Sequence, residues 1–147
     1  MIYLGADHRG YNLKDVIKDY LDELGYEYQD LGAFELDEND DYTNYAEKVA
    51  SRIIDPEDRG IVICGSGTGV DIVANKHDGV RAGLALNVEQ IKSARHDDDI
   101  NVLALAADHT GEEDAKKIVN IFLETGFAGE ERHKRRLHDI EDLEEIN

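Results

Sequence analysis

Two spacings of apolar residues alternate along the chain, and each predicts a different element. Residues 61–63 are continuously apolar, which is typical of a strand covered by helices on both faces. Between residues 13 and 24 apolar side chains recur at helical spacing, and Gly25 ends that stripe. On these patterns we expect strands at 2–5, 26–31, 60–64, 81–86 and 101–105, and helices at 13–24, 42–54, 68–76, 88–95, 112–125 and 131–145.

The alternation of strands and helices predicts an α/β fold. We expect one domain over residues 1–147, in three layers, with a mostly parallel sheet of about five strands and helices on both faces. In such sheets ligands bind at the carboxyl ends of the strands. Two predicted strand ends carry reactive side chains, namely Asp7-His8 and Cys64, so we expect a site there.

Composition narrows the possible partners. The chain has 34 acidic and 16 basic residues, a net charge of -18, which argues against nucleic acid or an anionic membrane as partner. We interpret the acidity as a solubility surface, with an acidic partner-binding face as the alternative. No apolar run is long enough to cross a bilayer. With one cysteine we expect neither disulfides nor a structural zinc site, and we expect a reducing cytoplasm.

The segment 64–69, Cys-Gly-Ser-Gly-Thr-Gly, has the order strand, glycine-rich loop, helix. Glycines let the backbone approach a ligand closely, and amides at a helix start favour negative charge. The segment matches neither the dinucleotide fingerprint, because Val70 stands at its last position, nor the phosphate-binding P-loop. A thiol at such a helix start is expected to have a lowered pKa and to act as a base or nucleophile. The alternative is a buried structural cysteine.

Asp7-His8 and a basic cluster at 132–136 are the other candidates. Asp7 is either a functional carboxylate or the cap of the following helix, and His8 is able to bind an anion. Arg132 and Arg136 lie four residues apart, on one face of the last predicted helix, where two guanidinium groups would meet a phosphate. The alternative for both arginines is ion pairing with nearby carboxylates of that helix.

Several motifs together resemble the ribose-5-phosphate isomerase type B family, which includes the galactose-6-phosphate isomerase subunits. They are Gly5-Ala-Asp-His-Arg-Gly-Tyr11, Asp41-Tyr42-x-x-Tyr45-Ala46, Gly60-Ile-Val-Ile-Cys64-Gly-Ser-Gly-Thr-Gly69, Ala74-Asn75-Lys76-x-x-Gly79-Val80-Arg81-Ala82, Asn101-Val-Leu-Ala-Leu105 and Phe127-x-Gly129-x-x-Arg132-His133-x-x-Arg136. The resemblance implies a flavodoxin-like fold, a homodimer with shared active sites, and aldose–ketose isomerisation of a sugar phosphate without metal or cofactor.

The resemblance also assigns roles by position. Cys64 would move the proton between C1 and C2, and Asp7 would handle a sugar hydroxyl. His8 would contact the substrate phosphate, as would Arg132 and Arg136, from the partner chain. The loop around the enediolate would consist of Gly65, Ser66, Gly67, Thr68 and Gly69. Some relatives use a Glu six residues after the cysteine position; Val70 stands there in this chain.

Three positions depart from the family pattern. Asp97 and Asp98 replace a His-Asn pair whose His helps to open the sugar ring, and Asp108 replaces an arginine. His96 lies one residue before the expected position, about 100° away around a helix. We therefore expect His96 or Asp97 to serve in ring opening and Asp98 to contact the substrate; the alternative is an enzyme that accepts only the open-chain sugar. Repulsion among the consecutive carboxylates is expected to raise one pKa and to keep a proton available.

The predicted reaction is the interconversion of ribose 5-phosphate and ribulose 5-phosphate through an enediolate. Two alternatives stay open. One is an isomerase of a hexose 6-phosphate, such as galactose or allose 6-phosphate. The other is a non-catalytic sensor of phosphorylated sugars, which loss of the His-Asn pair favours and retention of Cys64 and Asp7 opposes.

Overall fold

The computed structural model describes residues 1–147 and contains one sheet of five parallel strands. The strands are β1 (Ile2–Ala6), β2 (Tyr28–Asp30), β3 (Arg59–Cys64), β4 (Ala82–Leu84) and β5 (Val102–Ala106). The helices are α1 (Tyr11–Leu24), α2 (Tyr42–Ala50), α3 (Thr68–Ala74), α4 (Val88–Asp98), α5 (Glu112–Glu124) and α6 (Glu131–Ile146). The predicted α/β class is confirmed.

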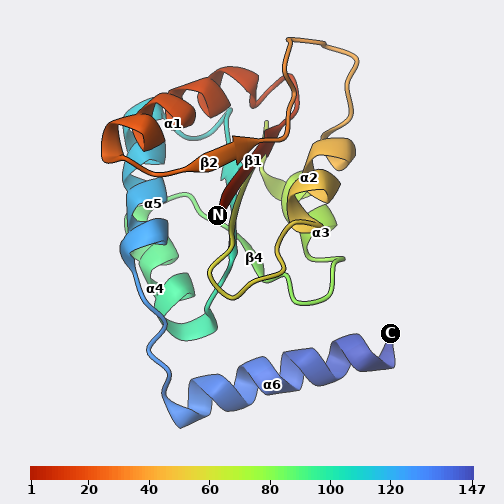
Figure 1. Cartoon of the computed structure of the whole chain (residues 1–147), viewed down its shortest axis with the longest axis vertical. Coiled ribbons are helices and arrows are strands. Elements are labelled where there is room, and N and C mark those ends of the chain that lie inside the picture. The colour runs from red at the N-terminus through yellow and green to blue at the C-terminus, as the bar shows by residue number, and fades with distance from the viewer.

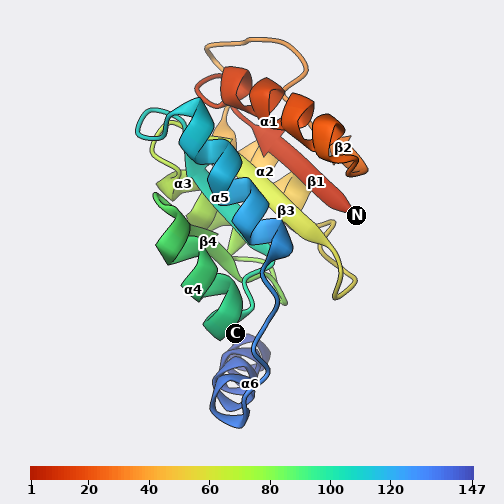
Figure 2. The same cartoon turned by 90° about the vertical axis from the view of Figure 1, so that its left-hand side faces the viewer.

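The helices form two layers that enclose the sheet. Helices α1, α4 and α5 cover one face, and α2 and α3 cover the other (Figures 1 and 2). Side chains of β3 alternate between the two resulting cores: Ile61 and Ile63 pack toward α1 and α5, whereas Val62 and Cys64 pack toward α2 and α3. This alternation fixes the side of the sheet on which the thiol lies.

The strand order is β2-β1-β3-β5-β4, so β5 lies between β3 and β4. The first three positions are those of the flavodoxin order, and the last two are exchanged. Every residue of β5 is buried, as a central strand requires, whereas the short β4 is only partly buried at the edge. Strands β1 and β3 are neighbours, so Asp7 and Cys64 leave the sheet at the same edge.

Local hydrogen bonds set the ends of several elements. Gly25 ends α1 in a left-handed conformation, with φ 78°, as the sequence predicts. The helix expected over 42–54 ends instead at Ala50. The turn that follows is closed by Asp58, whose carboxylate accepts the N–H groups of Ile54 and Asp55 at 3.2 and 2.9 Å.

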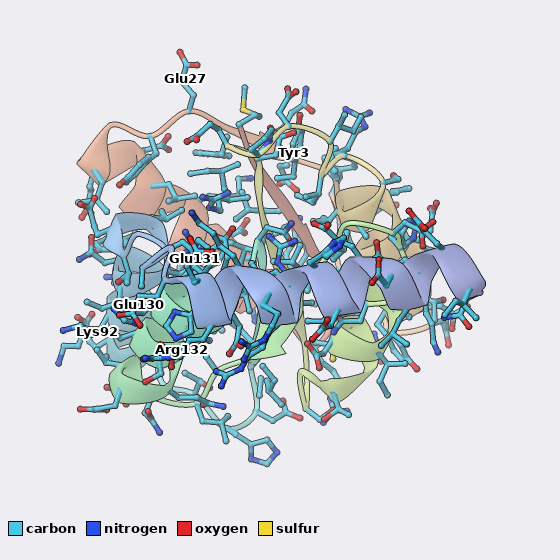
Figure 3. All side chains as sticks on the ribbon, turned by 90° about the horizontal axis from the view of Figure 1, so that it is seen from below. Tyr3, Glu27, Lys92, Glu130, Glu131 and Arg132 are labelled. Atoms are coloured by element: carbon cyan, nitrogen blue, oxygen red, sulfur yellow. The ribbon has the colours of Figure 1, made fainter.

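Helix α6 stands apart from the two layers. It crosses beyond edge strand β4 and contacts the body mainly through α4 (Figures 1 and 3). A cavity of about 480 Å³ lies between α6 and the β4–α4 region, lined partly by Ile140 and Leu143. Leu143 and Ile146 are 60% and 79% exposed, so α6 has an apolar side without a partner in this chain. None of the helices is long and apolar enough to span a membrane.

Candidate active site

A cavity of about 330 Å³ opens where β1 and β3 end. It brings together the two strand ends that the sequence singled out, Asp7 and Cys64. The residues that line it are Asp7, Arg9, Tyr42, Cys64, Gly65, Ser66, Thr68, Gly69 and Ile72. The larger cavity beside α6 contains none of these residues, so we take the smaller one, which holds the thiol and the glycine loop, as the candidate active site.

Cys64 lies at the floor of this cavity as a free thiol, only 4% exposed. Cys64 is therefore buried, as the structural alternative from the sequence expected, but its side chain also faces an open cavity. Val70, six residues later, is completely buried in the core beside Ala74 and is apolar. Of these two positions, only Cys64 carries a group that can take up a proton.

The glycine loop follows Cys64 in a conformation that only a few residues can adopt. Gly67 has a φ of 72°, and a Cβ atom there would lie 2.5 Å from a side-chain carbon of Leu84. The backbone N–H groups of Ser66, Gly67 and Gly69 donate to no protein acceptor, whereas that of Thr68 donates to Ser66 Oγ at 3.3 Å. Three free amides beside a thiol are suited to bind a developing oxyanion.

Asp7 combines the two roles that the sequence left open. Its Oδ1 accepts the N–H groups of Arg9 and Gly10, both at 3.0 Å, and so caps the turn before α1. Its Oδ2 accepts no hydrogen bond, although the residue is only 4% exposed and lines the cavity. That oxygen is available to a sugar hydroxyl.

His8 is held by a residue that the sequence analysis missed, Asp40. Asp40 Oδ1 lies 3.0 Å from the backbone nitrogen of His8 and 2.7 Å from its Nδ1. This hydrogen bond is the main reason why the pKa of His8 is raised, and the charge of Asp7 adds to the effect. Only the position of Asp40 in the acidic loop before α2 could have suggested it, because the contact spans 32 residues.

Asp7, His8 and Asp40 place three potential ligand atoms within 4.8 Å of one another. The expectation from the sequence included no such convergent set, because it did not include Asp40. In this structure the Nδ1 of His8 and the Oδ1 of Asp40 are already engaged with each other. The absence of a metal from the reaction stays a prediction.

The remaining predicted residues lie at the opposite end of the sheet. Asp97 and Asp98 end α4 just before β5 begins, whereas Cys64 follows the carboxyl end of β3. The length of β5 alone separates the two ends by about 15 Å. Asp98 lines the larger cavity beside α6, and none of His96, Asp97 and Asp98 lines the cavity of Cys64.

The expected rise in a carboxylate pKa is wrong for Asp97. Its Oδ1 lies 2.7 Å from Nδ1 of His96 and 3.8 Å from Nε2 of His133. The hydrogen bond with His96 lowers the pKa of Asp97, because it favours the charged carboxylate more than desolvation disfavours it, and the nearby charges of His133 and Arg132 act in the same direction as the hydrogen bond. Asp97 is therefore a hydrogen-bond acceptor for His96, not a store of protons.

The two arginines of α6 also lie away from the cavity of Cys64. Figure 3 shows Glu130, Glu131 and Arg132 at the end of α6 that lies over α4. Arg132 forms an ion pair with Glu130 at 3.0 Å, which is the alternative to phosphate binding that the sequence left open. Arg136, one turn further on, is exposed and forms no ion pair within 4 Å. Within one chain, Arg132 and Arg136 therefore do not reach the thiol.

The chain is similar to known sugar-phosphate isomerases over almost its full length. The family model described as Ribose/Galactose Isomerase matches residues 2–140. The putative sugar phosphate isomerase YwlF of Bacillus subtilis is 40% identical over 147 residues, 99% of this chain and 98% of that protein. Ribose-5-phosphate isomerase B of Mycobacterium leprae is 37% identical, over 97% of this chain and 89% of that protein.

Solved structures agree with this similarity. Ribose-5-phosphate isomerase B of Mycoplasma genitalium, with bound ribulose 5-phosphate, superposes with a TM-score of 0.94 at 37% identity, covering 99% of this chain and 97% of that one. Ribose-5-phosphate isomerase B of Clostridium thermocellum gives 0.94 at 40% identity, with the same coverage. The resemblance inferred from the motifs is confirmed.

Proposed function

The chain belongs to the ribose/galactose isomerase family, and from this premise we propose that it interconverts ribose 5-phosphate and ribulose 5-phosphate, with Cys64 as the base. The observation that carries the proposal is the cavity in which a buried thiol, the free Oδ2 of Asp7 and three unpaired loop amides meet. That set supplies a base, a hydroxyl partner and an oxyanion site in one place.

In the proposed reaction the thiolate of Cys64 removes the proton from C2 of the open-chain aldose. The electron pair of that C–H bond forms the C1–C2 double bond, and the carbonyl oxygen becomes the enediolate oxygen. The N–H groups of Ser66, Gly67 and Gly69 donate to this oxyanion, while Asp7 accepts from a neighbouring hydroxyl. The proton on O2 then moves to O1, with the Asp7 carboxylate beside the two oxygens as its carrier. Return of the first proton from the thiol to C1 forms the C2 carbonyl and gives the ketose, with no metal or cofactor.

The phosphate does not react, and its binding holds the sugar in position. We propose that His8 contacts it from one chain and that Arg132 and Arg136 reach it from a second copy. The division of the predicted residues between the two ends of one sheet supports a homodimer with shared sites. The exposed apolar side of α6 and the adjoining cavity offer the surface that a second copy would cover.

Ring opening is assigned to the partner's half of the shared site. His96 carries an imidazole suited to proton transfer at neutral pH, and Asp97 fixes its ring through Nδ1. Asp98 is proposed to bind the sugar. The free thiol also accords with a reducing, cytoplasmic location, which we propose for the protein.

A coupled assay over a panel of aldose phosphates, with and without a chelator, tests the substrate and the absence of metal. Cys64→Ala should abolish isomerisation, because it removes the group proposed to take the proton from C2, while inorganic phosphate still binds. An active Cys64→Ala protein would end the cysteine mechanism. Faster turnover of a hexose 6-phosphate would show that ribose 5-phosphate is not the preferred substrate. Binding of sugar phosphates without turnover of any of them would favour a sensor.

A further inference from the structure

We propose that Arg9 binds the substrate phosphate at the mouth of the Cys64 cavity, and that Asp108 positions Arg9 for this contact. The inference deepens the proposed function and rests on it for the identity of the substrate. Neither residue was among the candidates from the sequence.

Arg9 forms part of the cavity wall beside the reacting groups. It lines the same cavity as Cys64 and Asp7, and its guanidinium lies beside Gly65, where a Cβ atom of residue 65 would be. A Cβ atom at residue 65 would collide with that guanidinium, so the glycine makes room for it. The side chain of Arg9 is 54% exposed, whereas Cys64 is 4% exposed. Arg9 therefore lies at the mouth of the cavity and the thiol at its floor.

Asp108 holds both the guanidinium and the loop beneath it. Its carboxylate accepts a hydrogen bond from Nη2 of Arg9, and its backbone N–H donates to the carbonyl of Gly65 at 3.0 Å. The preceding N–H, of Ala107, donates to the carbonyl of Cys64 at 2.9 Å. The end of β5 thus fixes Arg9 and the start of the glycine loop in one arrangement.

The positions of Cys64 and Arg9 in the cavity determine which part of the substrate each residue contacts. The carbon acid must reach Cys64 at the floor, so the phosphate at the far end of the sugar extends toward the mouth. A guanidinium has five N–H donors, so Arg9 can donate two parallel N–H groups to a phosphate dianion while Nη2 still donates to Asp108. The arrangement also accounts for an aspartate at position 108, since Arg9 neutralises its charge.

Three variants test the role of Arg9: Arg9→Ala, Arg9→Lys and, as a control that removes one cation, Arg52→Ala. Arg52 is exposed just after α2, at the other end of the sheet, where it donates to Gln29. Arg9→Ala should raise KM and the Kd of inorganic phosphate about tenfold or more, with Arg9→Lys between it and the wild type. Arg52→Ala should have the KM and the phosphate Kd of the wild type. All three variants should have the unfolding temperature of the wild type.

Two outcomes would overturn the assignment. One is a phosphate Kd in Arg9→Ala within about twofold of the wild-type value. The other is a fall in kcat alone, which would place the guanidinium at the enediolate. If the wild type isomerises no sugar phosphate, the proposed function fails, and the phosphate Kd still decides the role of Arg9.

An exchange of the two residues tests the part played by Asp108. Arg9→Asp alone should lose phosphate binding, because it places two carboxylates at the mouth. Adding Asp108→Arg restores one guanidinium and one carboxylate there, and the Kd of phosphate should return to within about threefold of the wild type. A double variant that binds phosphate no better than Arg9→Asp would refute positioning by Asp108.

Discussion

Among single residues, Asp40 acts directly on the charge of its neighbour His8. Its side chain is 6% exposed, and Oδ1 meets both the backbone nitrogen and Nδ1 of His8. The hydrogen bond that Nδ1 of His8 donates to the Asp40 carboxylate raises the pKa of His8, the charge of Asp7 adds to the rise, and the charge of Arg9 opposes it. A raised pKa keeps the imidazole cationic to a higher pH, and its charge is lost as pH rises through that value.

Asp40→Asn should therefore weaken phosphate binding at neutral and mildly alkaline pH and leave it nearly unchanged in mild acid, where His8 is cationic in both proteins. The measurement is the Kd of inorganic phosphate against pH, together with an NMR titration of His8. Asp41→Asn is the matched control, since Asp41 precedes α2 without a side-chain hydrogen bond. A titration of His8 that does not move in Asp40→Asn would refute the coupling.

The sequence predicts those residues of the site that follow a recognisable element, and it misses those whose contacts join distant parts of the chain. Asp7 and Cys64 could be identified because each follows a buried strand, and strand ends meet at one edge of a parallel sheet. Asp40 and Asp108 could not, because they act on residues 32 and 99 positions away and no spacing pattern records such contacts. The rise in pKa expected for one of the carboxylates 97–99 does not occur at Asp97, because its hydrogen bond with His96 was not part of the sequence pattern.

At the scale of elements, a buried ion pair joins α1 to β2 and the loop that follows. The side chain of Lys14 is completely buried, and Nζ donates to Asp30 Oδ1 at 2.7 Å and to the carbonyl of Ala33 at 2.5 Å. Burial alone would raise the pKa of Asp30, but hydrogen bonds from Lys14, Lys18 and a backbone amide lower it overall. Because folding lowers the pKa of Asp30, its charged carboxylate stabilises the fold at every pH above the ordinary pKa of an aspartate. That stability is lost as pH falls through the lowered pKa of the folded state.

Asp30→Asn should reduce the free energy of unfolding at pH 7 by about 3 kcal/mol, because it leaves the buried Lys14 ammonium with neutral acceptors only. It should also flatten the decline of stability below about pH 4. Urea unfolding at several pH values measures both effects. Lys18→Ala, which removes a 28% exposed partner of the same carboxylate, should cost less than about 1 kcal/mol. Equal losses in the two variants would contradict the buried-pair account.

The periodicity of apolar residues predicted the existence and type of every strand and helix. It did not predict the order of β5 and β4, which depends on how much of each strand is buried once helices pack on the sheet. Nor did it predict that α6 leaves the body, because an apolar stripe specifies that a face is to be covered without specifying what covers it.

For the whole molecule, the net charge of -18 acts against compactness. Between 0.01 and 1 M salt the screening length falls from about 30 to about 3 Å, so repulsion among the acidic side chains weakens. The unfolding temperature at fixed protein concentration should therefore rise by several degrees as KCl increases over that range. A temperature that stays constant or falls would show that the acidity does not limit stability.

The proposed sharing of sites between two copies has its own test. Cys64→Ala and Arg136→Ala proteins should each be inactive or nearly so, because each lacks one half of every site. When subunits are exchanged between them, half of the dimers are mixed and each has one intact site, so about a quarter of the wild-type activity should return. Mixing Cys64→Ala with Asp7→Asn restores no intact site and is the control. No recovery in the first mixture would rule out shared sites.

The separation of α6 from the body bears on how long one chain survives outside the proposed dimer. Residues 125–130 connect α5 to α6, and proteases cut most readily in segments with few packed contacts. One cut there would release Arg132, Arg136 and the apolar side of α6 together, and would leave the five-stranded sheet whole. Limited proteolysis should therefore remove α6 first from a lone subunit, and a subunit covered by a second copy should resist that cut.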